Sequence, residues 1–123
     1  MYFLRTIQDG LHGTISEIII QYITIPGTTV LSCQYEKNPT LRWRQGDSII
    51  SQGSQINPTF NGSERFRVIN KLQDKQYELQ ILNTTEEDLG LYVCEAQLTS
   101  DTTETKVMLK LEGKIIYFQL GEL

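Results

Sequence analysis

Short runs of alternating hydrophobic and polar residues, separated by turn-forming residues, recur along most of the chain. In residues 77–81, for example, a tyrosine, a leucine and an isoleucine alternate with a glutamate and a glutamine. A period of two is typical of a β-strand with one buried face, whereas an amphipathic helix needs a period near 3.6. No long helical period is present, so the pattern predicts an all-β fold with little helix.

Turn signals bound the segments in which this alternation predicts strands. These segments are residues 22–25, 28–35, 41–44, 49–50, 66–68, 77–81, 91–98 and 105–111. The predicted core residues are Leu31, Cys33, Leu41, Trp43, Phe66, Val68, Tyr77, Leu79, Ile81, Val107, Leu109 and Leu111. Residues 51–63, rich in glycine, serine and asparagine, are predicted to form an irregular loop or a weak edge strand. Residues 84–90 are predicted to form a turn with one capped helical turn.

Length and charge narrow the class of protein. A chain of 123 residues with 39% hydrophobic residues is enough for one packed core and too small for two independent domains. The 11 basic and 15 acidic side chains give a net charge of −4, which offers no broad positive field to a nucleic acid. The longest apolar runs are strand-sized, well below the ~20 residues that span a bilayer. We therefore expect neither nucleic-acid binding nor direct membrane insertion of this chain.

Catalytic and metal-binding groups are scarce. His12 is the only histidine, so neither a Ser-His-Asp relay nor a multi-histidine metal site can be assembled. Acidic residues 86–88 have a simpler role in capping the predicted turn. Cys33 and Cys94 are the only cysteines, which allows one disulfide or two free thiols. We expect no enzyme activity, no cofactor, no metal and no small-molecule substrate.

A specific signature appears at Cys33, at Trp43 and in the run Asp88-Leu89-Gly90-Leu91-Tyr92-Val93-Cys94. Over residues 18–111 the chain resembles the immunoglobulin superfamily. The resemblance implies a two-sheet Greek-key sandwich in which Cys33 and Cys94 form one inter-sheet disulfide against Trp43. It also implies a tyrosine corner at Tyr92, a structural Gly90 and an Arg65–Asp88 pair at the base of a variable-type or intermediate domain.

A disulfide would also indicate where the protein works. Closing a loop of this length stabilises a domain by roughly 4 kcal/mol in the chain-entropy model. Disulfides persist in oxidising compartments, so the resemblance implies an extracellular or cell-surface protein. The alternative is an intracellular, muscle-type immunoglobulin domain with reduced cysteines. Asn61 and Asn83 lie in glycosylation motifs, whereas proline blocks the motifs at Asn38 and Asn57.

Alternation about Trp43 and Cys94 predicts which side chains point away from the core. The predicted partner-binding residues are Arg42, Arg44, Ile50, Val93, Glu95, Gln97 and Met108. One of the adjacent Ile49 and Ile50 must point outward, and Ile50 is the residue predicted to do so. An apolar centre ringed by charges resembles a protein interface, although an ordinary solvated sheet face is the alternative.

The leading hypothesis is a protein-binding module for cell-surface recognition or adhesion. Residues 65–111 also resemble the outermost domain of the lachesin, amalgam and IgLON adhesion proteins, which implies a homophilic or related immunoglobulin-domain partner. The alternatives are a receptor-associated immune domain with a heterologous partner, and a spacer domain without a ligand. We expect an unassigned extension at residues 1–16, the immunoglobulin-like domain at 17–112, and a linker or tag remnant at 113–123.

Overall fold

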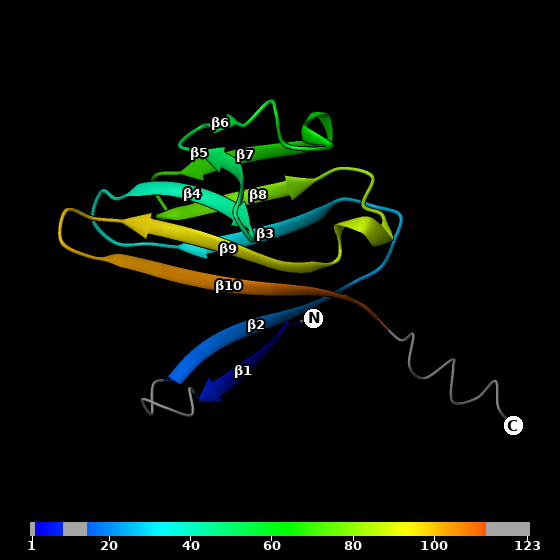
Figure 1. Ribbon diagram of the computed structural model, residues 1–123, viewed down its shortest axis with the longest axis horizontal. Helices are drawn as coiled ribbons and strands as arrows, with labels where there is room; N and C mark the ends of the chain where they lie inside the picture. Colours follow the sequence, from blue (N-terminus) through cyan, green and yellow to red (C-terminus); the bar gives the residue numbers. More distant parts are fainter. Residues whose placement is uncertain (1, 9–14, 113–123) are drawn as a thin grey trace, which may run out of the picture.

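The alternating segments fold into strands that build two facing sheets (Figure 1). The computed structural model describes residues 2–8 and 15–112, and for residues up to 16 it describes the backbone alone. His12 and the predicted tail at 113–123 lie outside the described residues. Strands dominate the described part, which also holds the single 3-10 turns η1 (Ser63–Arg65) and η2 (Glu86–Asp88). The all-β prediction is therefore confirmed.

The larger sheet has seven strands among the described residues. Their order is β1 (Tyr2–Gln8), β2 (Ile15–Ile23), β10 (Thr102–Leu111), β9 (Gly90–Gln97), β4 (Thr40–Gln45), β5 (Ser48–Gln52) and β6 (Gln55–Ile56). The facing sheet has the order β3 (Thr29–Gln34), β8 (Gln76–Ile81) and β7 (Phe66–Lys71). The segment 51–63, predicted to be an irregular loop or a weak edge strand, contains the two-residue edge strand β6.

The N-terminal residues extend the larger sheet at one edge. Strand β2 pairs in parallel with β10, and β1 pairs antiparallel with the other side of β2 (Figure 1). The extension that the sequence left unassigned therefore includes a strand. Because β2 begins at Ile15, the predicted boundary between residues 16 and 17 falls inside this strand.

The core lies between the sheets and contains the predicted disulfide. Cys33 of β3 is bonded to Cys94 of β9, so the bond links the two sheets. Trp43 belongs to the same buried cluster, and its ring stacks on that of Tyr77 with centroids 6.4 Å apart. The Tyr77 hydroxyl donates to the Gly53 carbonyl over 2.6 Å, so this buried ring has its polar end satisfied.

Most predicted core residues lie in this cluster. Val68 packs against it as a partly buried residue, and Leu111 is only half-buried because it lies at the end of β10. The alternation did not single out Ile23, Tyr35, Ile50 or Ala96, which also belong to the cluster.

At the base of the sandwich, Arg65 and Asp88 form a bidentate ion pair. The two terminal nitrogens of Arg65 donate to the two carboxylate oxygens of Asp88, each over 2.9 Å. Asp88 also accepts from the Thr85 N–H, which closes a capping box around η2. The Tyr92 hydroxyl donates to the Asp88 carbonyl over 2.6 Å, the geometry of a tyrosine corner. Gly90 follows with a φ of 130°, a region that favours glycine.

These contacts set the ionisation of Asp88. Burial by itself would raise the pKa of its carboxyl, but the hydrogen bonds from Arg65 and Thr85 and the Arg65 charge lower the pKa overall. A carboxyl whose pKa is lower in the folded state contributes stability above its unfolded pKa, near 4. That contribution is lost as the pH falls through the folded-state pKa.

We expect Arg65→Ala to lower the free energy of unfolding at pH 7 by about 3 kcal/mol, because it leaves the buried Asp88 carboxylate without its cation. The difference from wild type should shrink as the pH falls below about 4 and through the lowered folded-state pKa of Asp88. Urea unfolding between pH 7 and pH 3 measures both effects. Arg67→Ala, at an exposed arginine of β7, is the matched control and should change stability by less than about 0.5 kcal/mol. An equal loss in both variants would contradict the pairing.

Candidate protein-binding face

The outer face of the larger sheet, turned away from the core, carries most of the predicted partner-binding residues. The side chains of Trp43 on β4 and Cys94 on β9 are fully buried in the core. Successive side chains of a strand point to opposite sides, so the neighbours of these anchors point outward. We define the outer face by Arg42, Arg44, Ile49, Val93, Glu95, Gln97, Glu104, Lys106 and Met108.

Ile50 does not belong to this face, and its prediction as a binding residue is wrong. Its side chain has no exposed surface and lies in the core cluster. The reason is an irregularity between β4 and β5, where Trp43 pairs with Ser51 but Arg44 pairs with Ile49. Such a bulge breaks strict alternation, so Ile50 and Ser51 are both buried although they are adjacent. The half-buried Ile49 lies on the outer face instead.

The apolar centre of the outer face is less exposed to solvent than predicted. Val93 is only 3% exposed, although it lies outside the core cluster. Its register partners are Arg44 on β4 and Lys106 on β10, whose long side chains flank it on both sides. Met108 and Ile49 keep partial exposure, and Gln97 is exposed. The accessible apolar surface therefore lies at Met108 and Ile49 rather than at Val93.

A network of four charged side chains crosses the face. Glu95, only 8% exposed, pairs with Arg42 through one carboxylate oxygen and with the Arg44 Nε, over 3.2 Å, through the other. Arg44 continues the network to Glu104 over 2.8 Å and donates to the Gly46 carbonyl over 3.0 Å. Glu104 was not among the predicted binding residues, because its place opposite Glu95 follows from the β9–β10 register.

The network favours the charged forms of Glu95 and Arg44. Burial by itself would raise the pKa of the Glu95 carboxyl, but hydrogen bonds from Arg42 and Arg44 lower it overall. Burial likewise opposes the charge on Arg44, yet its bonds to Glu104 and Glu95 raise its pKa overall. The network therefore joins two positive and two negative side chains by ion pairs, and Lys106 adds a third positive side chain to the outer face.

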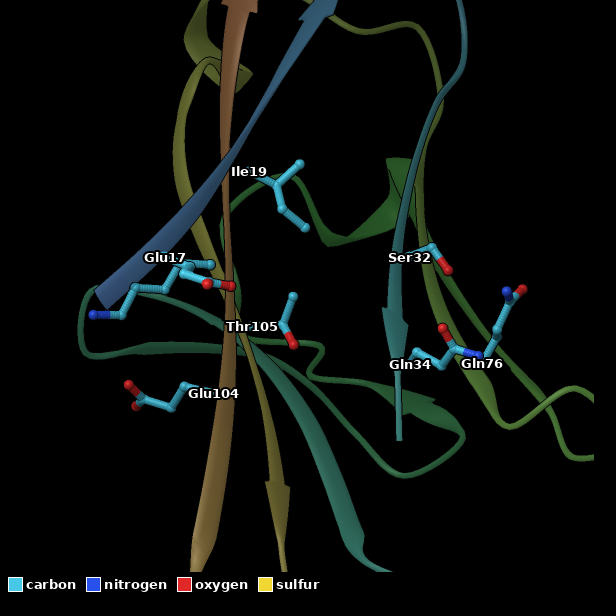
Figure 2. Close-up of a pocket in the computed structure, with 8 residues that line it drawn as sticks. Glu17, Ile19, Ser32, Gln34, Gln76, Glu104 and Thr105 are labelled. Carbon is cyan, nitrogen blue, oxygen red and sulfur yellow. The ribbon is translucent and has the colours of Figure 1, made fainter. Parts of the chain in front are cut away.

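A polar cavity opens beside this face, between the edges of the two sheets (Figure 2). It has a volume of about 420 Å³. Ile19 and Thr105 lie on one wall, and Ser32, Gln34 and Gln76 lie on the other (Figure 2). The lining also includes the charged residues Glu17, Glu104 and Lys106, so it combines charged, amide and hydroxyl groups with the apolar Ile19. Within residues 17–112, no group of histidine, cysteine, aspartate and glutamate side chains is arranged to hold a metal ion.

The two glycosylation motifs lie near each other at the base of the sandwich. Asn61 and Asn83 are both exposed. The Arg65 N–H donates to the carbonyl of Gly62, next to Asn61, over 3.0 Å, and the Arg65 side chain donates to the Asn83 carbonyl over 3.2 Å. Neither asparagine lies on a strand that carries the outer face.

The described residues contain no helix with the length and hydropathy of a membrane-spanning segment.

The disulfide, the two sheets and the Tyr92 corner together point to one family. A family model for the immunoglobulin domain matches residues 22–107. The chain belongs to the immunoglobulin domain family. A search of curated proteins finds no match to this immunoglobulin domain.

Solved structures share the same fold. The structure of the ZIG-8–RIG-5 IG1–IG1 heterodimer matches with a TM-score of 0.63 and 21% identity, over 75% of this chain and 80% of that one. A structure of human TIM members matches with a TM-score of 0.59 and 20% identity, over 72% and 94%. The complex of Dpr2 Ig1-Ig2 with DIP-Theta Ig1–Ig3 matches with a TM-score of 0.61 and 18% identity, over 74% and 31%. At these identities the likeness shows the fold alone.

We expect Glu95→Gln to lower the free energy of unfolding by about 1–2 kcal/mol at pH 7, because Arg42 and Arg44 lose their shared anion. The pKa of Glu95 is lowered by folding, so the difference from wild type should be present above about pH 4.3 and shrink below it. Urea unfolding at pH 7 and pH 3 measures it. Glu104→Gln, at a more exposed member of the network, should cost less than about 1 kcal/mol. A larger loss in the Glu104 variant would contradict the central position of Glu95.

Proposed function

We propose that this immunoglobulin domain is an extracellular module that binds another protein through its outer face. The observation that carries the proposal is the network around Glu95, in which a nearly buried carboxylate holds two arginines on an otherwise partly apolar sheet surface. Arginine is enriched at interface hot spots, and a fixed side chain loses little entropy on binding. A merely solvated sheet face has no need for such ordering.

The disulfide supports an extracellular location. The Cys33–Cys94 bond is buried and joins the two sheets, so it contributes to the stability of the fold. Such bonds form and persist in oxidising compartments. An intracellular, muscle-type domain would keep both thiols reduced and would lose this contribution. Immunoglobulin-domain relatives are typically extracellular or cell-surface proteins, which agrees with this proposal.

We infer that the partner is a second copy of this chain or a related immunoglobulin-domain protein. Two of the similar structures are complexes, the ZIG-8–RIG-5 heterodimer and the Dpr2–DIP-Theta complex. The resemblance to lachesin, amalgam and IgLON proteins stays a prediction. A receptor-associated immune domain with a heterologous partner is the alternative. Immunoglobulin folds generally serve binding rather than catalysis, and we propose no enzymatic role.

We also propose that Asn61 and Asn83 carry N-linked glycans. Both side chains are exposed at the base of the sandwich, where a bulky modification meets no packed neighbour. Glycans there would leave the strands of the outer face, β4, β9 and β10, open to a partner.

Met108→Asp should weaken association at least tenfold, an effect of about 1.4 kcal/mol, because it places a charge in the accessible apolar part of the face. Association is measured by sedimentation of the pure domain over a range of concentrations, and by binding to an array of immunoglobulin-domain ectodomains. Leu72→Asp, at a residue 72% exposed in the β7–β8 turn, makes the same chemical change away from the face and should leave association unchanged.

These measurements also separate the partner classes. A dimer of the pure domain favours homophilic recognition, and a monomer that binds an ectodomain favours a heterologous partner. The proposed function is wrong if the domain neither self-associates nor binds any ectodomain, or if the Met108 and Leu72 variants behave alike.

Protein secreted from animal cells should carry two glycans. Treatment with peptide N-glycosidase should reduce its mass by both glycans, and Asn61→Gln and Asn83→Gln should each remove one. The double variant should keep the association of the wild type, because neither asparagine lies on the outer face. Secreted protein without glycans would contradict the glycosylation proposal and would leave the proposal on the binding face unaffected.

A further inference from the structure

We propose that Arg42 of the outer face binds the partner protein directly. The group that it binds is the carboxylate of an aspartate or glutamate of that partner. The inference rests on the proposed function and adds to it the residue and the chemistry of recognition.

The Arg42 guanidinium is paired at its Nε and exposed at its two terminal nitrogens. Its Nε pairs with Glu95 Oε1, and this is the one polar contact that the Arg42 side chain makes among the described residues. Its two terminal nitrogens therefore have no hydrogen-bond partner in that part of the chain. The side chain is 38% exposed, so the unpaired end reaches solvent. Four N–H donors on a planar group are thus available to an incoming acceptor.

Arg44, two residues further along β4, differs in this respect. Its Nε pairs with Glu95, one terminal nitrogen donates to the Gly46 carbonyl, and the other pairs with Glu104. Its side chain is also less exposed, at 25%. Because each of its nitrogens has an acceptor, Arg44 maintains the network and has no free donor edge to offer. Both arginines were predicted as partner-binding residues from the sequence, but their contacts give them different roles.

Glu95 prepares Arg42 for binding. The carboxylate is nearly buried and is itself fixed by Arg44, so it restricts the guanidinium plane of Arg42 before any partner arrives. Ordering a long side chain on association costs about 0.5–1.5 kcal/mol, and this prior ordering reduces that cost. The planar fork of an arginine matches the two oxygens of a carboxylate in a bidentate geometry.

The surroundings favour a singly charged, planar acceptor. The register partners of Arg42 are Glu95 on β9 and Gln52 on β5, and the exposed Gln97 lies beside them on β9. These two glutamines are neutral, so Glu95 is the one acidic group among the three neighbours. Arg44 is already neutralised by its own partners. A single open guanidinium matches the single charge of a carboxylate, whereas a phosphate dianion would call for a second free cation.

The direct test uses the domain with ¹⁵N-labelled arginine and observes its side-chain resonances by NMR. The spectra are recorded while sodium acetate is added, and again with sodium chloride at the same ionic strength. We expect the Nε and terminal nitrogen resonances of Arg42 to move with acetate, and those of Arg44 to stay in place. The proposal is overturned if Arg44 or Arg65 moves as far as Arg42, if chloride has the same effect, or if phosphate moves Arg42 at a lower concentration than acetate.

A second test measures association through the variants Arg42→Lys and Arg67→Lys. Lysine keeps the charge but lacks the fork, so Arg42→Lys should weaken association about tenfold while the domain stays folded at the temperature of the binding assay. Arg67→Lys makes the same change on the smaller sheet and should have no effect. Undiminished association of the Arg42 variant overturns this proposal and leaves the proposed function in place. Acetate binding at Arg42 without any protein partner supports the carboxylate site and contradicts the proposed function.

Discussion

The bond between Cys33 and Cys94 is the constraint on which the two-sheet arrangement depends. It joins β3 of the smaller sheet to β9 of the larger one and is buried with Trp43 in the same cluster. Because Cys94 is fixed toward the core, its neighbours Val93 and Glu95 must point to the other side of β9. The covalent link that holds the sheets together therefore also decides which residues the domain presents to a partner.

Two buried carboxylates hold arginines in this domain, and they do so in different ways. Asp88 binds both terminal nitrogens of Arg65, which leaves that guanidinium closed and gives it a structural role at the base. Glu95 binds Arg42 through Nε alone, which leaves the terminal nitrogens open toward solvent. The chemistry of the pairs is the same, and the difference in role follows from which edge of the guanidinium the carboxylate occupies.

Alternation along the chain predicted most of the core, since strands with one buried face carry a strong period-two signal. It failed at Ile50, where the bulge between β4 and β5 places two successive residues inside. It also predicted the direction of Val93 but not its burial. Periodicity reports which way a side chain points, whereas its exposure depends on how far the neighbouring Arg44 and Lys106 side chains reach across it.

Cys33, Trp43 and the run from Asp88 to Cys94 were enough to predict the family, the disulfide and the base of the sandwich, because they belong to a local signature with fixed spacing. Alternation also predicted most residues of the outer face, but the contacts among them follow from the folded structure. The pairing of Glu104 with Arg44, and the contrast between Arg42 and Arg44, depend on the register of β9 with its neighbour β10 and with β4, which lies far from both along the chain. Register depends on the hydrophobic pattern and the turn geometry acting together in a sheet with one buried face, so the partners of a charged residue on the other face are settled only when the strands pair.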